Sequence, residues 1–102
     1  AIGSPGGPRI ITSIYLILFH HLFRGKSLSE SVILPRIHHQ WSPDEVYVES
    51  QDSEVARGLT LRGQHIGQSS MYFGDVQAVQ KVSENEVVAI SDPRSDGVPW
   101  AK

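Results

Sequence analysis

Apolar side chains fill most positions from Ile10 to Phe23, whereas glycine and proline dominate the residues just before them. The apolar positions fall on all sides of a helical period, which predicts a helix buried on several sides rather than along one face. Pro8 suits the first helical position, because its missing N–H is not needed there. Gly25 suits a C-terminal stop. We therefore expect a helix from Pro8 to about Arg24.

Capping signals predict a second, shorter helix. Ser27 and Glu30 have the S-x-x-E spacing of a capping box, in which each residue bonds the backbone N–H of the other. Pro35 cannot continue a helix, because its ring clashes with the preceding turn. A helix is therefore expected to begin near Leu28 and to end at Pro35.

A third helix is expected further along the chain, capped by Asp52 or Ser53, extending through Leu61 and closed by Gly63. Alternating or β-branched positions predict strands in four places. They are the end of a strand at Ala1–Ile2, a short strand at Val46–Val48, and a hairpin formed by Asp75–Val82 and Glu86–Ile90 around a turn at 83–85. Residues 36–45 show no period and are interpreted as an irregular connection that turns at 42–44.

This order of elements predicts a mixed α/β (α+β) fold with antiparallel pairing near the end of the chain. The whole of 1–102 is interpreted as a single segment without internal repeats. The apolar segments outside Ile10–Phe23 are few and short, so they cannot cover that helix by themselves. We therefore expect the chain to need further polypeptide, or a second copy of itself, to bury the helix.

The charge balance narrows the classes of partner. Eleven acidic and nine basic residues give a formal net charge of −2, so no nucleic acid or anionic membrane is expected as a partner. The chain has no cysteine, which excludes disulfides, thiolate metal sites and a cysteine nucleophile within it. The apolar stretch is shorter than the roughly 20 residues that span a bilayer. No signal peptide is recognisable at Ala1–Gly7.

The loop Gly3–Gly7 carries the clearest candidate chemistry. Backbone N–H groups at a helix N-terminus favour negative charge, so the loop suits a phosphate, a carboxylate or an oxyanion. No Lys-Ser/Thr pair follows it and the spacing is not G-x-G-x-x-G, which argues against both nucleotide-binding motifs. From residue types alone, a plain strand-to-helix turn and an anion-binding loop both remain open.

The other polar candidates favour structural roles. The doublets His20-His21 and His38-His39 suggest a metal, but adjacent helical residues point about 100° apart and no H-x-x-x-H spacing is present. No metal and no cofactor are therefore expected. Asp92 and Arg94 are interpreted as a local ion pair or turn rather than as an acid–base pair.

Four segments occur in register along the chain: "GSPGGPRIIT", "LPRIHHQWSPDEVYVE", "FGDVQAV" and "AISDPRSDG". Together they closely resemble the C-terminal part of the light (small) subunit of gamma-glutamyltranspeptidases, also called gamma-glutamyltransferases or glutathione hydrolases. The resemblance covers essentially the whole chain. It implies a partial αββα sandwich of the N-terminal nucleophile hydrolase type, with antiparallel strands and a buried central helix.

The resemblance also implies a function. Family members cleave the gamma-glutamyl bond of glutathione and related small-molecule donors through an N-terminal threonine nucleophile, and transfer the group to water, an amino acid or a peptide. The matching positions of the glycine pair, Gly6 and Gly7, would supply backbone N–H groups to an oxyanion hole. The family's residue after the pair is commonly small or threonine, so Pro8 departs from its pattern.

Ala1 has no hydroxyl or thiol, so we expect the nucleophile to lie outside these residues and the chain alone to be inactive. The expected partners are the remainder of the light subunit and the heavy subunit, or a second copy of the chain. Family members usually work outside the cytoplasm. The alternative interpretation is a free-standing, non-catalytic light-chain-like module with a structural or interaction role.

Overall fold

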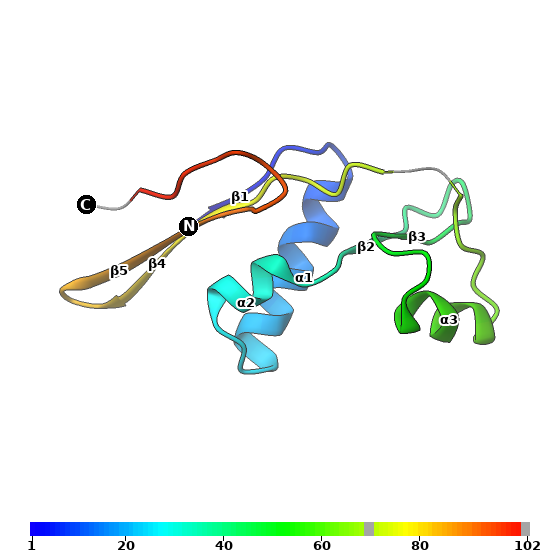
Figure 1. Ribbon diagram of the computed structural model, residues 1–102, viewed down its shortest axis with the longest axis horizontal. Helices are drawn as coiled ribbons and strands as arrows, with labels where there is room; N and C mark the ends of the chain where they lie inside the picture. The colour runs from blue at the N-terminus through cyan, green and yellow to red at the C-terminus, as the bar shows by residue number, and fades with distance from the viewer. Residues whose placement is uncertain (69–70, 101–102) are drawn as a thin grey trace. The chain divides into compact units, whose positions relative to one another are not determined.

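The computed structural model describes residues 1–68 and 71–100. The chain divides into two compact units. The first combines Ala1–Leu34 with the residues from Gly74 onward, and the second is Pro35–Phe73. The first unit is therefore built from two segments that are separated in sequence by the whole of the second (Figure 1).

Two helices form much of the first unit. The helix α1 (Arg9–Phe23) begins after Pro8 and ends at Phe23, with Arg24 as its C-cap, within about one residue of the expected bounds. The helix α2 (Leu28–Ile33) begins with the expected capping box. The Ser27 hydroxyl accepts the Glu30 N–H at 3.2 Å, and Glu30 Oε2 accepts the Ser27 N–H at 2.8 Å.

An antiparallel sheet completes the first unit. The strands β4 (Gln77–Ser83) and β5 (Glu86–Ser91) form the expected hairpin, and β1 (Ile2–Gly3) pairs with the other edge of β4 (Figure 1). In this register Gly3 lies opposite Gln77. The core between sheet and helices consists of Ile17, Leu28, Val32, Val76 and Ala78, with Ile2 and Ile90 packed against it.

The expected burial of α1 on several sides is not found within the described chain. Of its side chains, Ser13 and Ile17 are the buried ones. Tyr15, Leu22 and Phe23 are 62%, 65% and 77% exposed. The sheet and α2 cover one side of the helix and leave the other side to solvent, which agrees with the expectation that this chain cannot cover the helix alone. No helix in residues 1–68 and 71–100 has the length and apolarity needed to cross a membrane.

The second unit is small and mixed. The helix α3 (Glu54–Leu61) begins as expected, with the Ser53 hydroxyl accepting the Ala56 N–H at 3.1 Å. The strands β2 (Ile37–His38) and β3 (Tyr47–Val48) pair antiparallel. The interpretation of residues 36–45 as irregular throughout was therefore wrong at β2, because two residues are too few to show an alternating pattern. The apolar centre is formed by Val46, Val48 and Ala56, with Ile37, Leu59 and Ile66 against it.

Candidate functional site

The loop between β1 and α1 has a backbone that only glycine adopts easily. Gly6 and Gly7 have φ values of +136° and +59°, a region that other L-residues rarely enter. The Gly6 carbonyl accepts the Arg9 N–H at 3.2 Å, and the Gly7 carbonyl accepts the Ile10 N–H at 3.1 Å. The loop carbonyls therefore form part of the start of α1.

The hydrogen bond to the Gly6 carbonyl determines where the Gly7 N–H points. A trans peptide holds its C=O and the following N–H on opposite sides. Because the Gly6 carbonyl is bonded to the helix, the Gly7 N–H points away from the helix. Within residues 1–68 and 71–100, neither the Gly6 nor the Gly7 N–H donates a hydrogen bond. Gly6 is half-buried and Gly7 is exposed.

The electrostatics of this loop favour a negative partner. The N-terminal end of α1 carries the positive end of the helix dipole. Pro8 contributes no N–H, so it does not compete with the two glycines as a donor. Two N–H groups next to each other at this position can hold an anionic oxygen, and they provide neither a nucleophile nor a proton acceptor.

Ser4 joins this loop to a distant part of the chain. Its hydroxyl donates to the Pro5 carbonyl at 2.7 Å and accepts the Asp75 N–H at 3.1 Å. Gly74 lies directly beneath: a Cβ built there would lie 2.6 Å from Ser4 Oγ and 3.3 Å from the Pro5 oxygen. We call this set of contacts the Ser4 bridge. Reasoning from residue types missed it, although Gly74 and Asp75 belong to the "FGDVQAV" segment singled out above.

The predicted pairing of Asp92 with Arg94 is confirmed. Arg94 Nη1 lies 3.0 Å from Asp92 Oδ1, and the Arg94 backbone N–H donates to the same oxygen at 3.1 Å. The other oxygen, Oδ2, accepts the Val76 N–H at 2.9 Å. The Arg94 guanidinium also donates to the Val32 and Leu34 carbonyls at 3.0 Å, a reach that residue types did not predict.

The side chain of Asp75 also forms hydrogen bonds. Its Oδ1 accepts the Ser95 hydroxyl at 2.7 Å and the Gln77 side-chain amide at 2.8 Å. The segment 75–76 is thus bonded to the turn that follows β5, and through its backbone to Ser4. Residues 75–76 therefore connect the glycine loop to the turn after β5, and we assign them no part in the chemistry.

The histidine doublets make local contacts. Their ring nitrogens meet carbonyl, amide and carboxylate oxygens: His21 Nδ1 lies 2.8 Å from the Lys26 carbonyl, His38 Nε2 lies 2.9 Å from Gln40 Oε1, and His39 Nε2 lies 3.1 Å from Asp44 Oδ1. Phe19 meets the His20 ring edge-on, with the ring centroids 5.8 Å apart. In the described part of the chain, no three His, Asp or Glu side chains are grouped so that they could hold a metal ion.

Comparisons with known proteins converge on one family. Residues 1–101 match the family model described as Gamma-glutamyltranspeptidase. The chain is 36% identical over 94 residues to the "Glutathione hydrolase proenzyme" of Escherichia coli (strain K12), a match over 91% of this chain and 16% of that protein. It is 35% identical over 103 residues to "Glutathione hydrolase proenzyme 1" of Schizosaccharomyces pombe, covering 98% of this chain and 16% of that protein.

A solved structure agrees in fold. The gamma-glutamyltranspeptidase from Pseudomonas nitroreducens, complexed with L-DON, superposes with a TM-score of 0.87 at 32% identity. The match covers 99% of this chain and 54% of that chain. The present chain thus spans about half of that solved chain and about a sixth of the curated relatives.

Proposed function

Because this chain belongs to the gamma-glutamyltranspeptidase family, we propose that it forms one wall of the active site of an enzyme that cleaves gamma-glutamyl bonds. The donors are glutathione and related small molecules, and the acceptor is water, an amino acid or a peptide. The chain's mixed α/β fold with antiparallel sheets would be part of an αββα sandwich in the complete enzyme, with α1 as its central helix.

The observation that carries this proposal is the pair of N–H groups at Gly6 and Gly7. When a nucleophile attacks an acyl carbon, the carbonyl oxygen becomes an oxyanion, and N–H donors about 2.7–3.1 Å from that oxygen stabilise it. Within residues 1–68 and 71–100 neither N–H group donates a hydrogen bond, and Gly7 is exposed to solvent. Their place at the start of α1 adds the favourable helix dipole.

The nucleophile belongs to another part of the enzyme. In this proposal it is the N-terminal threonine of the light subunit, whose hydroxyl attacks the gamma-glutamyl carbonyl while an amine takes the hydroxyl proton. The C–N bond then breaks, the leaving amine receives the proton, and an acyl-enzyme forms. Water or an acceptor amine releases the acyl group by the same two steps. Gly6 and Gly7 would stabilise the oxyanion in both halves of the reaction.

The exposed side of α1 supports the need for partners. Ile11, Tyr15, Leu22 and Phe23 are all more than half exposed in this chain. Burying large apolar side chains is favourable by about 1.5–3 kcal/mol each. The remainder of the light subunit and the heavy subunit would cover this side, and a second copy of the chain is the other occupant that we consider.

The test compares two glycines in the complete enzyme. Gly7 and Gly25 have similar φ values of +59° and +68°, and a Cβ at either would lie in open space. Alanine should therefore cost a similar 1–2 kcal/mol or so of backbone strain at each position. Only Gly7→Ala places a methyl group beside the oxyanion donors, so we expect kcat to fall by about 10²–10³ in that variant alone.

The readout is the release of an anilide from a gamma-glutamyl donor, with the melting temperature of each variant as the measure of strain. Equal activity of the Gly7→Ala and Gly25→Ala variants would contradict the oxyanion assignment.

A further inference from the structure

We propose that Ser4 is a positioning residue for the oxyanion hole: its hydroxyl fixes the glycine loop on the Gly74–Asp75 segment and thereby aims the N–H group of Gly6, while the bond from the Arg9 N–H to the Gly6 carbonyl directs that of Gly7. This inference rests on the proposed function, and it assigns a role to the "FGDVQAV" segment that the resemblance left without one. Ser4 itself would touch neither the substrate nor the nucleophile.

The link between the glycine loop and the segment before β4 begins where the sheet ends. The β1–β4 ladder pairs Gly3 with Gln77, its last pair on this side. The next N–H along that strand, that of Val76, donates to Asp92 Oδ2 at 2.9 Å. The Asp75 N–H donates to the Ser4 hydroxyl at 3.1 Å. The link between the two segments therefore continues beyond the ladder through a side chain.

The peptide group between Pro5 and Gly6 carries one of the two N–H donors. The Ser4 hydroxyl donates to the Pro5 carbonyl at 2.7 Å. That carbonyl and the Gly6 N–H belong to one planar peptide group, in which they point in opposite directions. A bond that fixes the Pro5 carbonyl therefore fixes the direction of the Gly6 N–H. A hydroxyl can do this while accepting from Asp75, because it has one proton and two lone pairs.

The glycine loop approaches the backbone closely at Gly74. A Cβ there would lie 2.6 Å from Ser4 Oγ and 3.3 Å from the Pro5 oxygen. A Cβ built on Gly6 would lie 3.7 Å from the Gly74 Cα, which is ordinary contact. The loop therefore packs closely against the backbone of Gly74, and the Ser4 hydroxyl bonds it to the next residue, Asp75.

The test is a series of substitutions at Ser4 in the complete enzyme. Ser4→Thr keeps the hydroxyl. Ser4→Cys keeps the size but offers only a weak donor and a weak acceptor. Ser4→Ala removes both bonds. The control is Ser29→Ala on α2, which removes an exposed serine hydroxyl that lies 3.1 Å from Ser27 Oγ.

Each variant is characterised by kcat and KM for a gamma-glutamyl anilide, and by its affinity for a boronate that forms a tetrahedral adduct in place of the gamma-carboxyl carbon. Active sites are counted with a covalent inhibitor, so that kcat refers to folded enzyme. For Ser4→Ala we expect kcat to fall about tenfold to 100-fold, because misplaced groups cost rate on this scale. We expect KM to stay within about twofold and the boronate affinity to fall in parallel with kcat.

We expect kcat and boronate affinity to be highest with serine or threonine at position 4, lower with cysteine and lowest with alanine. The Ser29→Ala variant should match the native enzyme in both. Unchanged kcat and boronate affinity in Ser4→Ala would overturn the proposal. A loss in Ser4→Ala that Ser4→Thr fails to restore, or that raises KM as much as it lowers kcat, would overturn it too. If Gly7→Ala lowers kcat and Ser4→Ala does not, only the role of Ser4 fails; if Gly7→Ala acts like Gly25→Ala, the oxyanion assignment itself fails.

Discussion

Arg94 lies 3.0 Å from Asp92, and the two partners differ in their exposure to solvent: the Asp92 side chain is fully buried, whereas that of Arg94 is 20% exposed. The guanidinium also reaches the Val32 and Leu34 carbonyls at the end of α2. The pair therefore joins the turn after β5 to the end of a helix about 60 residues earlier in the sequence.

Removing Arg94 should destabilise the protein strongly. Arg94→Ala would remove one partner of an ion pair in which the Asp92 carboxylate is fully buried, a change that typically costs about 3–5 kcal/mol of unfolding free energy. The matched control is Arg57→Ala, because Arg57 pairs with Glu54 at 3.8 Å with both side chains mostly exposed. Such pairs are worth about 0–1 kcal/mol. Urea denaturation of both variants checks the difference, and equal effects would contradict the role given to Arg94.

The capping box of α2 should make stability depend on pH. The Ser27 backbone N–H and hydroxyl both donate to Glu30 Oε2 at 2.8 Å and, with Lys26 nearby, hold the pKa of Glu30 below its ordinary value. The folded state thus prefers the carboxylate. The carboxylate therefore contributes fully to the folding stability above the unfolded pKa of about 4.3. This contribution is lost as the pH falls through the lower folded pKa.

The variant that tests this is Glu30→Gln, since glutamine can still accept from Ser27 but does not titrate there. We expect the stability difference between the native protein and the variant to shrink when the pH is lowered from 6 to about 3. Urea midpoints at a series of pH values measure it. A difference that stays constant over this range would show that Glu30 does not contribute to the pH dependence.

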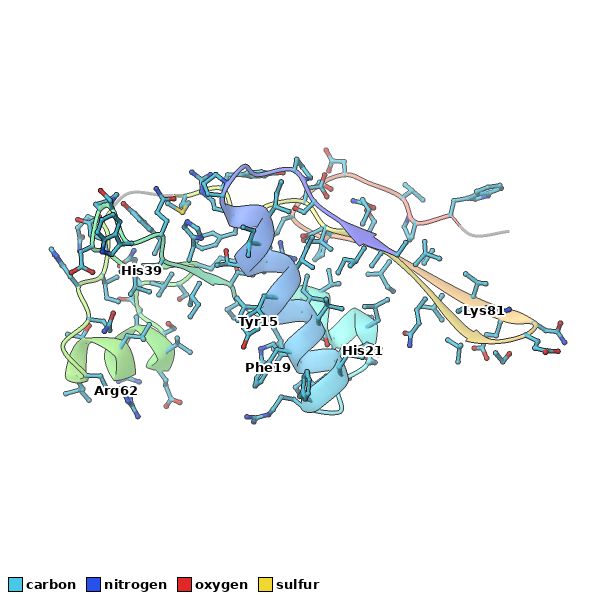
Figure 2. All side chains as sticks on the ribbon, turned by 180° about the vertical axis from the view of Figure 1, so that it is seen from behind. Tyr15, Phe19, His21, His39, Arg62 and Lys81 are labelled. Atoms are coloured by element: carbon cyan, nitrogen blue, oxygen red, sulfur yellow. The ribbon has the colours of Figure 1, made fainter. Side chains whose placement is uncertain are left out.

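The open side of α1 should make the chain associate when it is purified by itself. The rings of Tyr15, Phe19 and Phe23 stack along this side, with successive centroids 6.1 and 6.0 Å apart (Figure 2 labels the first two). Together with Leu18 and Leu22 they line an apolar pocket. We expect sedimentation to show dimers or larger species, and the double variant Tyr15→Lys/Phe23→Lys to shift the chain toward monomer.

The control for this prediction is Leu61→Lys in the second unit. Leu61 is 88% exposed at the end of α3 and is not part of a row of stacked aromatic rings such as that on α1. Its replacement should leave the sedimentation unchanged. A monodisperse, cooperatively folded monomer of the unmodified chain would show that α1 tolerates its exposed side.

The histidines should bind no stoichiometric zinc. The Trp41 N–H donates to His39 Nδ1 at 3.1 Å, so the ring proton of neutral His39 is on Nε2, which faces Asp44. His21 Nδ1 faces a carbonyl that can only accept, so it carries its own proton. Metal analysis after dialysis against zinc checks this, with a His39→Ala variant for comparison. One tightly held ion per chain would contradict the prediction, and its loss in the variant would place the ion at His39.

Local signals made much of the fold predictable. The capping residues Ser27 and Ser53 and the stop at Gly25 placed the three helices to within a residue or two, because caps act over a single turn. The hairpin followed from alternation on both sides of a turn. Asp92 and Arg94 were predictable as a pair for the same reason, since they are two residues apart.

Features that depend on residues far apart in the sequence could not be predicted from residue types. The strand β2 is defined by its partner β3 rather than by its own pattern. The carbonyls that Arg94 reaches, and the N–H that Ser4 accepts, lie about 60 to 71 positions away. The apolar pattern of α1 indicated that it must be covered, and it contained no information about which polypeptide covers it.

The Ser4 bridge also bears on the order in which the protein folds. Ser4 and Asp75 are 71 residues apart, whereas the capping box of α2 and the β4–β5 hairpin join near neighbours in sequence. Closing a long loop costs entropy before any contact forms, so distant pairings are slow relative to local ones. The glycine loop should therefore acquire its final geometry late, after the helices and the hairpin exist. Refolding followed by hydrogen exchange would show protection at Asp75 appearing after protection within α1.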